Sequence, residues 1–290
     1  MSEFIPIAMS GLSYGAVFAL AAVGFLLIYK GTGVINLAQG DLITMAAYVQ
    51  IWAATLVGLP WPVAVVATLV IMFGAGVVLE RVAVAPLRSR NVAVSVVATL
   101  GASLVIQAAL NFWQGSQPKT VPSPFADVTV DVAGARVQVQ QIVLIVVTGL
   151  VVAAVVWVFT RTRLGRDLRA LAGDRETATL YGVPVKRLSM LSWGLGAALA
   201  GLAGILAGPI TPVDLVYGYA LMFGAFGAVM LGGFGSIVGA AIAAVVLGLG
   251  RSLLGFYVLD DYAVLVPYVA IILVIALRPR GLFGRAEERL

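Results

Sequence analysis

Nine apolar runs follow one another along this chain, and each is long enough, at about 16–25 residues, to be read as a membrane helix. A bilayer core is crossed by roughly 20 apolar residues in helical form, because every backbone polar group must be hydrogen-bonded within the segment. The runs therefore predict an all-α, polytopic transmembrane bundle of eight or nine spans, forming a single transmembrane domain over residues 1–290. The expected spans are 5–29, 37–57, 61–79, 92–113, 139–160, 188–207, 217–233, 236–254 and 262–277.

Basic residues are distributed unevenly between the connections, and this predicts the orientation of the bundle. Alternate connections carry 15 Lys and Arg residues on one side, against Lys119 and Arg136 on the other. Because cytoplasmic loops are enriched in Lys and Arg, we expect the N-terminus outside and the C-terminus in the cytoplasm. The stretch 114–138 then becomes an external loop, either a small hairpin or a solvated linker. Segments 31–41 and 217–254 are rich in glycine and are alternatively read as re-entrant.

The longest charged interruption, residues 161–187, predicts a cytoplasmic loop that holds two short helices. Gly173 is expected to end the first in a left-handed conformation, Asp174 to cap the second, and Gly182 with Pro184 to end it. The second helix would cover about two turns, Arg175 to Tyr181. Such a short helix is unstable alone in water, so it must dock onto something else.

Uncharged polar residues recur every four positions along the fourth expected span. Four residues turn a helix by about 400°, so the row stays on one broad face. It can line a path for a polar solute, or it can hold helices together by hydrogen bonds. We take the path candidates in this row to be Thr99, Ser103 and Gln107.

The segment KGTGVINLAQGDL, which starts at Lys30, ends in the second expected span. Asn36 is expected to cap that helix, with Gln39 returning a bond to the Asn36 backbone. A carboxylate at mid-bilayer costs roughly 2.5–3.5 kcal/mol, so Asp41 should face water or protein. Asn36, Gln39 and Asp41 are further path candidates, and a helix start at the cytoplasmic surface is the alternative.

Several functions are disfavoured by residues that the sequence lacks. It has no Cys and no His, which makes zinc, haem and thiol chemistry poor choices, and no metal site is expected. It also lacks a GxxxxGK[ST] phosphate loop and a nucleophile with a base, so it is not expected to be an enzyme or to bind a cofactor. Nucleic-acid binding is not expected, because the basic residues fall in membrane loops. A proton- or sodium-coupled carrier normally needs several intramembrane acids, and Asp41 is the one candidate here, so an external energy source is favoured for a transporter.

Five stretches together resemble the permease subunits of branched-chain amino-acid ABC transporters. They are Glu-Thr-Ala-x-x-x-Gly at 176–182, GTGVINLAQGD at 31–41, GVPVKRLSMLSWGLGAALAGLAGIL at 182–206, MLGGFGSIVGAAIA at 230–243 and RPRGLFG at 278–284. The resemblance implies that Glu176, Ala178 and Gly182 mark a coupling helix seated on an ATPase subunit.

The same resemblance implies an importer permease in a bacterial inner membrane, crossing it several times. It implies a second permease, favoured as a paralogue, two ATPase subunits that bind ATP-Mg, and a periplasmic or extracellular binding protein. Leucine, isoleucine and valine are the expected solutes. The alternatives are a permease for urea or short amides, and a stand-alone secondary transporter.

Overall fold

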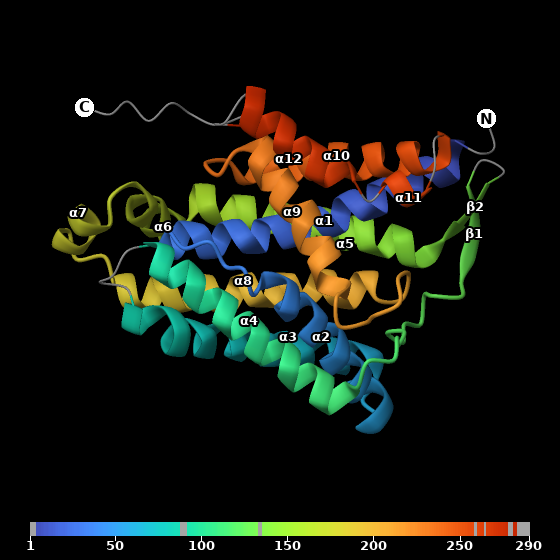
Figure 1. Ribbon diagram of the computed structural model, residues 1–290, viewed down its shortest axis with the longest axis horizontal. Helices are drawn as coiled ribbons and strands as arrows, with labels where there is room; N and C mark the ends of the chain where they lie inside the picture. The colour runs from blue at the N-terminus through green and yellow to red at the C-terminus, as the bar shows by residue number, and fades with distance from the viewer. Residues whose placement is uncertain are drawn as a thin grey trace. The chain divides into compact units, whose positions relative to one another are not determined.

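A computed structural model describes residues 4–87, 92–132, 135–257, 260–263, 265–277 and 281–282, which are mostly helical (Figure 1). The larger helices are α1 (Phe4–Thr32), α2 (Gln39–Ile51), α3 (Trp61–Leu79), α4 (Val92–Gln114), α5 (Val139–Arg161), α6 (Arg163–Gly173), α8 (Val185–Ala207), α9 (Tyr217–Gly232), α10 (Ile237–Tyr257) and α12 (Val266–Leu277). The shorter elements are α7 (Arg175–Leu180), α11 (Asp260–Ala263), the π-helical turns η1 (Trp52–Leu56) and η2 (Glu80–Val84), the 3-10 turn η3 (Ala85–Leu87), and the strands β1 (Thr129–Val132) and β2 (Ala135–Gln138).

Each of the nine expected spans contains a helix, which confirms the helical class of this membrane protein. Six helical segments in the described part of the chain are long and apolar enough to cross a bilayer: Phe4–Thr32, Trp61–Leu87, Ala93–Gln114, Val139–Arg161, Val185–Ala207 and Ile237–Tyr257. The helices α9 and α12 are apolar but shorter. The count of eight or nine crossings and the direction of the termini therefore stay predictions.

The chain forms two compact units, which are described separately. One unit comprises Met1–Val23, Ser123–Val152 and Ala220–Leu290, and the other comprises Gly24–Pro122 and Ala153–Tyr219. The prediction of a single transmembrane domain over the whole chain stays a prediction. The terminal stretch at 278–284 lies mostly outside the described residues, as do Arg88 and Arg90.

In the second unit, α2, α3, α4 and α8 lie alongside one another (Figure 1). Glycines let α8 approach its neighbours closely. A Cβ placed on Gly204 would lie 2.4 Å from the Ile43 carbonyl oxygen, and one on Gly76 would lie 2.3 Å from the Trp193 carbonyl oxygen. Backbones this close gain the packing contacts that replace the hydrophobic effect between helices in lipid.

In the first unit, α10 packs against the N-terminal part of α1 by the same device. A Cβ on Gly248 would lie 2.2 Å from the backbone nitrogen of Gly15. Strands β1 and β2 pair antiparallel with Val130 opposite Val137, so residues 114–138 form the hairpin rather than a plain linker, and their external location stays a prediction. Ser123 donates a hydrogen bond to Gln140 Oε1 at 2.7 Å, which joins the loop before the hairpin to the first turn of α5.

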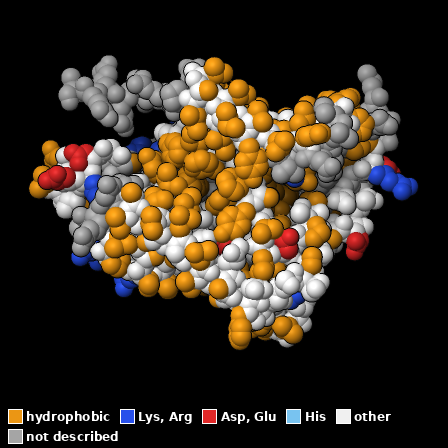
Figure 2. All heavy atoms as spheres, in the orientation of Figure 1, with side chains coloured by type: hydrophobic (Ala, Val, Ile, Leu, Met, Phe, Trp, Pro, Cys, Tyr) orange, Lys and Arg blue, Asp and Glu red, His pale blue; other side chains and the backbone are white. Residues whose placement is uncertain are grey.

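Large apolar side chains remain exposed along the helices, as expected for a protein whose surroundings are lipid. On α3 the exposed face carries Val63, Val66, Val70 and Val78, and on α5 it carries Val146, Leu150 and Trp157. Hydrophobic side chains cover most of the face seen in Figure 2. Charged side chains are visible beside α7 and also beside the β1–β2 hairpin.

Candidate functional site

A non-helical segment, residues 33–38, connects α1 to the first of two candidate sites. The Gly33 N–H donates to the Tyr29 carbonyl at 2.6 Å, and Gly33 has φ +72°, a conformation that ends α1 and favours glycine. Helix α2 then begins at Gln39, with Ala38 as its N-cap residue and no side-chain cap.

The capping box expected between Asn36 and Gln39 is wrong. Asn36 Oδ1 accepts the N–H of Ala38, two residues on, at 3.1 Å, so it is already occupied in a local turn. Asn36 Nδ2 donates to Gln39 Oε1 at 3.1 Å, and both side chains are fully buried. The two predicted path residues therefore pair through their side chains, just before and at the start of α2.

Asp41, in the first turn of α2, is the centre of a buried polar cluster. Its side chain is 0% exposed, and the hydroxyls of Ser103 and Tyr219 both donate to its Oδ2, the second at 3.1 Å. The two hydroxyl oxygens lie 2.7 Å from each other. Asp41 Oδ1 has no hydrogen-bond partner among the described residues. We call these three residues the Asp41 cluster.

The fourth-span row divides into a buried half and a more exposed half. Ser95, Thr99 and Ser103 are buried, whereas Gln107 is half-buried and Asn111 is exposed. A step of four residues overshoots a full turn by about 40°, so the row drifts off the buried face after three steps. The structure thus brings Ser103 to Asp41, whereas Gln107 is not among the described hydrogen-bond partners of Asp41.

Thr99 holds the connecting segment rather than the Asp41 cluster. Its Oγ1 accepts the Leu37 N–H at 3.1 Å and donates to the Val96 carbonyl at 2.8 Å. The bond from Leu37 joins α4 to residues 33–38. Thr99 thus fits the alternative in which the polar row holds segments together. Within the row, Thr99 and Ser103 thus make different kinds of contact.

The start of α9 reaches the Asp41 cluster through a very close backbone contact. A Cβ on Gly218 would lie 1.9 Å from the Gly40 carbonyl oxygen, so Gly218 is required here for lack of space. The Gly218 N–H donates to Thr44 Oγ1 at 3.0 Å. These two contacts place the neighbouring Tyr219 hydroxyl against Asp41.

Sequence reasoning missed three residues of this region. Thr44 and Tyr48 follow Asp41 by three and seven positions, so helical spacing would have placed them on the same face of α2. Tyr219 lies 178 positions from Asp41, and no periodicity in the sequence links them. The buried Tyr48 hydroxyl has no hydrogen-bond partner among the described residues, and Lys119 Nζ lies 5.9 Å from the centre of its ring.

The second candidate site is the loop formed by α6 and α7, in which α7 is capped as expected. Asp174 Oδ1 accepts the N–H groups of Glu176 at 2.9 Å and Thr177 at 3.2 Å. The Thr177 hydroxyl donates to Asp174 Oδ2 at 2.5 Å. The hydrogen bonds from the Thr177 hydroxyl and backbone, followed by that from Glu176, lower the pKa of Asp174, since they favour its charged form.

The loop glycines behave differently from one another. Gly182 has φ +78° with open space around it, which confirms a left-handed helix end at that position. The same expectation for Gly173 is wrong, because Gly173 is the last residue of α6 and has no positive φ. Helix α7 starts directly after α6. The single residue between them, Asp174, is extended and caps α7.

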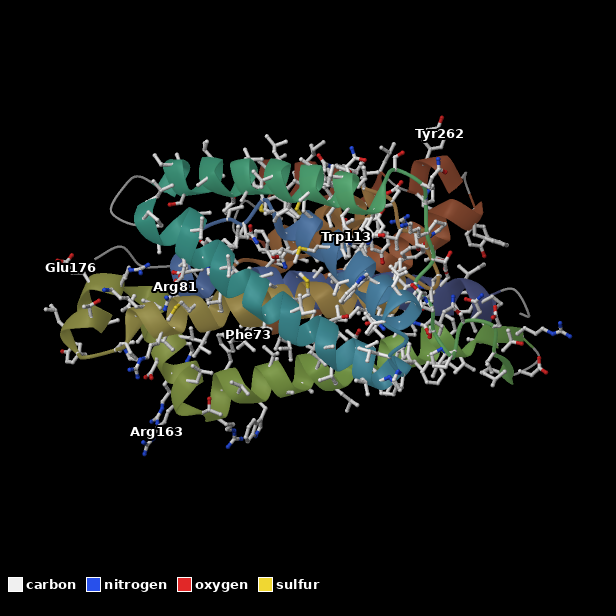
Figure 3. The ribbon with its side chains drawn as sticks, turned by 90° about the horizontal axis from the view of Figure 1, so that it is seen from below. Phe73, Arg81, Trp113, Arg163, Glu176 and Tyr262 are labelled. Atoms are coloured by element: carbon white, nitrogen blue, oxygen red, sulfur yellow. The ribbon has the colours of Figure 1, made fainter. Side chains whose placement is uncertain are left out.

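The α7 residues singled out from the sequence differ in exposure. Glu176 is exposed and points away from the ribbon (Figure 3), whereas Ala178 is 4% exposed. Leu180 and Tyr181 are 84% and 86% exposed. The end of α7 and its C-cap residue Tyr181 thus carry two large exposed side chains side by side in the sequence.

The described residues contain no group of three or more Asp or Glu side chains that could hold a metal ion. The arrangement can bind and position polar groups.

Comparison with known proteins places the chain in a family. Residues 7–275 match the family model described as branched-chain amino acid transport system / permease component. The chain is 32% identical to the high-affinity branched-chain amino acid transport system permease protein LivH of Escherichia coli, over 98% of this chain and 96% of LivH. It is also 32% identical to BraD of Pseudomonas aeruginosa, a permease protein of the same description, over 96% of this chain and 95% of BraD.

A more distant relative and a solved structure are consistent with this assignment. The ribose import permease protein RbsC of Escherichia coli is 33% identical over 44% of this chain and 43% of RbsC. A chain in the structure of PsaBC from Streptococcus pneumoniae in complex with Fab has the same fold, with a TM-score of 0.51 and 12% identity over 93% of this chain and 91% of that chain. The expected resemblance is confirmed, and the chain belongs to the branched-chain amino acid transport system permease family.

Proposed function

We propose that this chain is a permease subunit of an ATP-driven importer that carries branched-chain amino acids across a bacterial inner membrane. The observation that carries the proposal is the likeness to LivH and BraD over nearly the full length of all three chains. Buried apolar helices, an exposed α7 and a buried polar cluster support it. ATP hydrolysis belongs to partner subunits in this proposal, and this chain forms part of the solute path.

The α6–α7 loop is proposed to couple the chain to an ATPase subunit. Glu176 and the exposed side chains of Leu180 and Tyr181 would contact the ATPase, whereas buried Ala178 and left-handed Gly182 would fix the shape of α7. The isolated helix would gain from the partner the stability that its own length does not provide.

The remaining partners follow from the same proposal. A second permease, favoured as a paralogue, completes the pathway, two ATPases bind ATP-Mg, and a soluble binding protein delivers solute from outside. The N-terminus lies outside and α7 lies in the cytoplasm. The solute path includes Asn36, Gln39, Asp41, Thr99, Ser103 and Gln107.

Reconstitution tests the proposed function directly. The chain is assembled with the second permease, two ATPases and the binding protein encoded beside it, and uptake of labelled leucine into ATP-loaded proteoliposomes is measured. We expect uphill uptake that disappears when the ATPases cannot hydrolyse ATP. Accumulation of leucine by the permeases alone would instead identify a secondary transporter.

A loop variant tests coupling. The double variant Glu176→Lys, Gly182→Val should insert in the membrane normally but lose assembly and solute-stimulated ATP hydrolysis. Normal transport by this variant would remove the coupling role from α7.

A second variant tests the path. Changing Ser103 and Gln107 to Leu should lower transport while the complex stays assembled. Loss of assembly would show that the fourth-span row holds helices together instead.

A further inference from the structure

The Asp41 carboxyl is the most unusual polar group in the described part of the chain. It is fully buried in an apolar helical unit, and its side-chain hydrogen-bond partners among the described residues are the hydroxyls of Ser103 and Tyr219. Both hydroxyls meet Oδ2, and Oδ1 has no partner among the described residues. Buried polar atoms are nearly always hydrogen-bonded, and each exception calls for an explanation.

The surroundings of Asp41 are built to keep this oxygen in place. Ser103 and Tyr219 fix the side chain from α4 and from the first turn of α9, and the Gly218–Gly40 contact fixes the backbone that carries Tyr219. Tyr219 is only partly buried, so one member of the Asp41 cluster reaches the surface of the chain. An oriented carboxyl hydrogen-bonded to a partly exposed side chain is suited to binding.

We propose that Asp41 Oδ1 binds the ammonium group of the transported amino acid. This inference rests on the proposed function and names the part of the solute that the path recognises. An ammonium group carries three N–H donors and one positive charge, so it supplies the hydrogen bond that Oδ1 lacks and balances a buried carboxylate.

Other cations fit this site less well. Metal ions of the Mg²⁺ and Ca²⁺ type take about six or more oxygen ligands, and the described residues hold no cluster of acidic side chains that could supply them. Within the described part of the chain, Ser103 and Tyr219, rather than a Lys or Arg, pair with the Asp41 side chain. A single carboxyl oxygen with neighbouring hydroxyls suits a small group that brings its own donors.

The inference separates two features that branched-chain amino acids combine. The ammonium group is common to all amino acids, whereas the branched side chain is what differs between them. Asp41 would therefore recognise the class of solute, and the choice of side chain would be made elsewhere.

The test uses the permease pair with its ATPases in nanodiscs, without the binding protein, and measures ligand binding by saturation-transfer NMR. Three probes share a branched carbon skeleton: L-leucine, 3-methylbutylamine, which lacks the carboxylate, and 4-methylpentanoate, which lacks the ammonium. We expect the wild-type complex to bind leucine and the amine, and to bind the acid at least tenfold more weakly. Equal binding of the acid and leucine would overturn the proposal without any mutation.

Asp41→Asn keeps the shape of the side chain and removes its charge. It should weaken binding of leucine and of 3-methylbutylamine by about tenfold or more. The matched control is Asp214→Asn, which removes a partly buried carboxylate from the same unit outside the Asp41 cluster. Unchanged amine binding in Asp41→Asn, or an equal loss in both variants, would overturn the proposal.

Two further measurements distinguish failure of this inference from failure of the proposed function. Sodium-22 binding that depends on Asp41, with no amine binding, would show a metal-cation site and overturn the ammonium assignment. Wild-type leucine uptake in the reconstituted transporter reports on the proposed function separately. If uptake is present and Asp41-dependent amine binding is absent, this inference fails alone; if uptake is absent, the proposed function fails.

Discussion

Ser189 donates its hydroxyl proton to Glu80 Oε1 at 2.6 Å, and both side chains are buried. The bond joins α8 to the π-helical turn that continues α3. A buried carboxyl in a membrane unit depends on such donors, because water is not there to replace them.

Ser189→Ala should therefore lower the free energy of unfolding by about 1–3 kcal/mol, the usual cost of depriving a buried polar group of a partner. The matched control is Ser192→Ala on the same helix, since the buried Ser192 hydroxyl has no hydrogen-bond partner in the described part of the chain. We expect the control to be neutral or slightly stabilising in equilibrium denaturation of the detergent-solubilised protein. Equal losses in the two variants would show that the Glu80 bond contributes little.

The left-handed conformation of Gly182 predicts a backbone effect at that position. Gly182→Ala places a Cβ in open space but in an unfavourable conformation, which costs about 1–2 kcal/mol. Hydrogen exchange of the α7 amides should become faster, and solute-stimulated ATP hydrolysis should fall. Gly173→Ala, which has open space and no positive φ, should leave both measurements unchanged or slow the exchange. The prediction fails if the two variants behave alike.

The Asp174 cap predicts a pH dependence for α7. Hydrogen bonds from Thr177 and Glu176 lower the pKa of Asp174 in the folded loop. The cap is therefore fully present above the unfolded pKa of about 3.9, and it is lost as the pH falls through the lower folded value.

Hydrogen exchange of the Glu176 and Thr177 amides should thus show a protection loss below about pH 4 in the wild type. Asp174→Asn keeps an acceptor but does not titrate there, so its protection should lack this step. A step of the same size in Asp174→Asn would assign it to another group.

The absence of cysteine from the sequence makes the predicted orientation easy to test. Thr179→Cys on α7 and Thr129→Cys on β1 each place a thiol at an exposed position. In intact cells, a membrane-impermeant maleimide should label the Thr129 position, and the Thr179 position should be labelled after the membrane is opened. The reverse pattern would invert the proposed topology.

The helices were predictable because the length and apolarity of each run determine them locally. The Asp174 cap and the Gly182 end were predictable for the same reason, since a cap depends on residues two or three positions away. The left-handed conformation predicted for Gly173 was wrong because glycine permits that conformation without requiring it. The Asn36 cap was predicted wrongly because its oxygen accepts the Ala38 N–H in a local turn, and α2 begins only at Gln39.

The Asp41 cluster was predictable in part. The four-residue spacing found Ser103, and the cost of a buried charge predicted that Asp41 would face protein or water. Tyr219 could not be found in this way, because its place depends on how α9 begins against α2. That contact is a property of the folded backbone, and a single sequence carries no periodic signal for it.

Gly218 and Tyr219 are neighbours in the chain, yet the structure restricts them in unlike ways. At Gly218 any added atom collides with the Gly40 carbonyl, so volume alone rules out the other nineteen amino acids. At Tyr219 a ring of the same size without its hydroxyl would fit, and it would still lose the bond to Asp41. In a saturation library across these two codons, substitutions of Gly218 should therefore abolish folding, whereas substitution of Tyr219 by Phe should keep folding and lower transport.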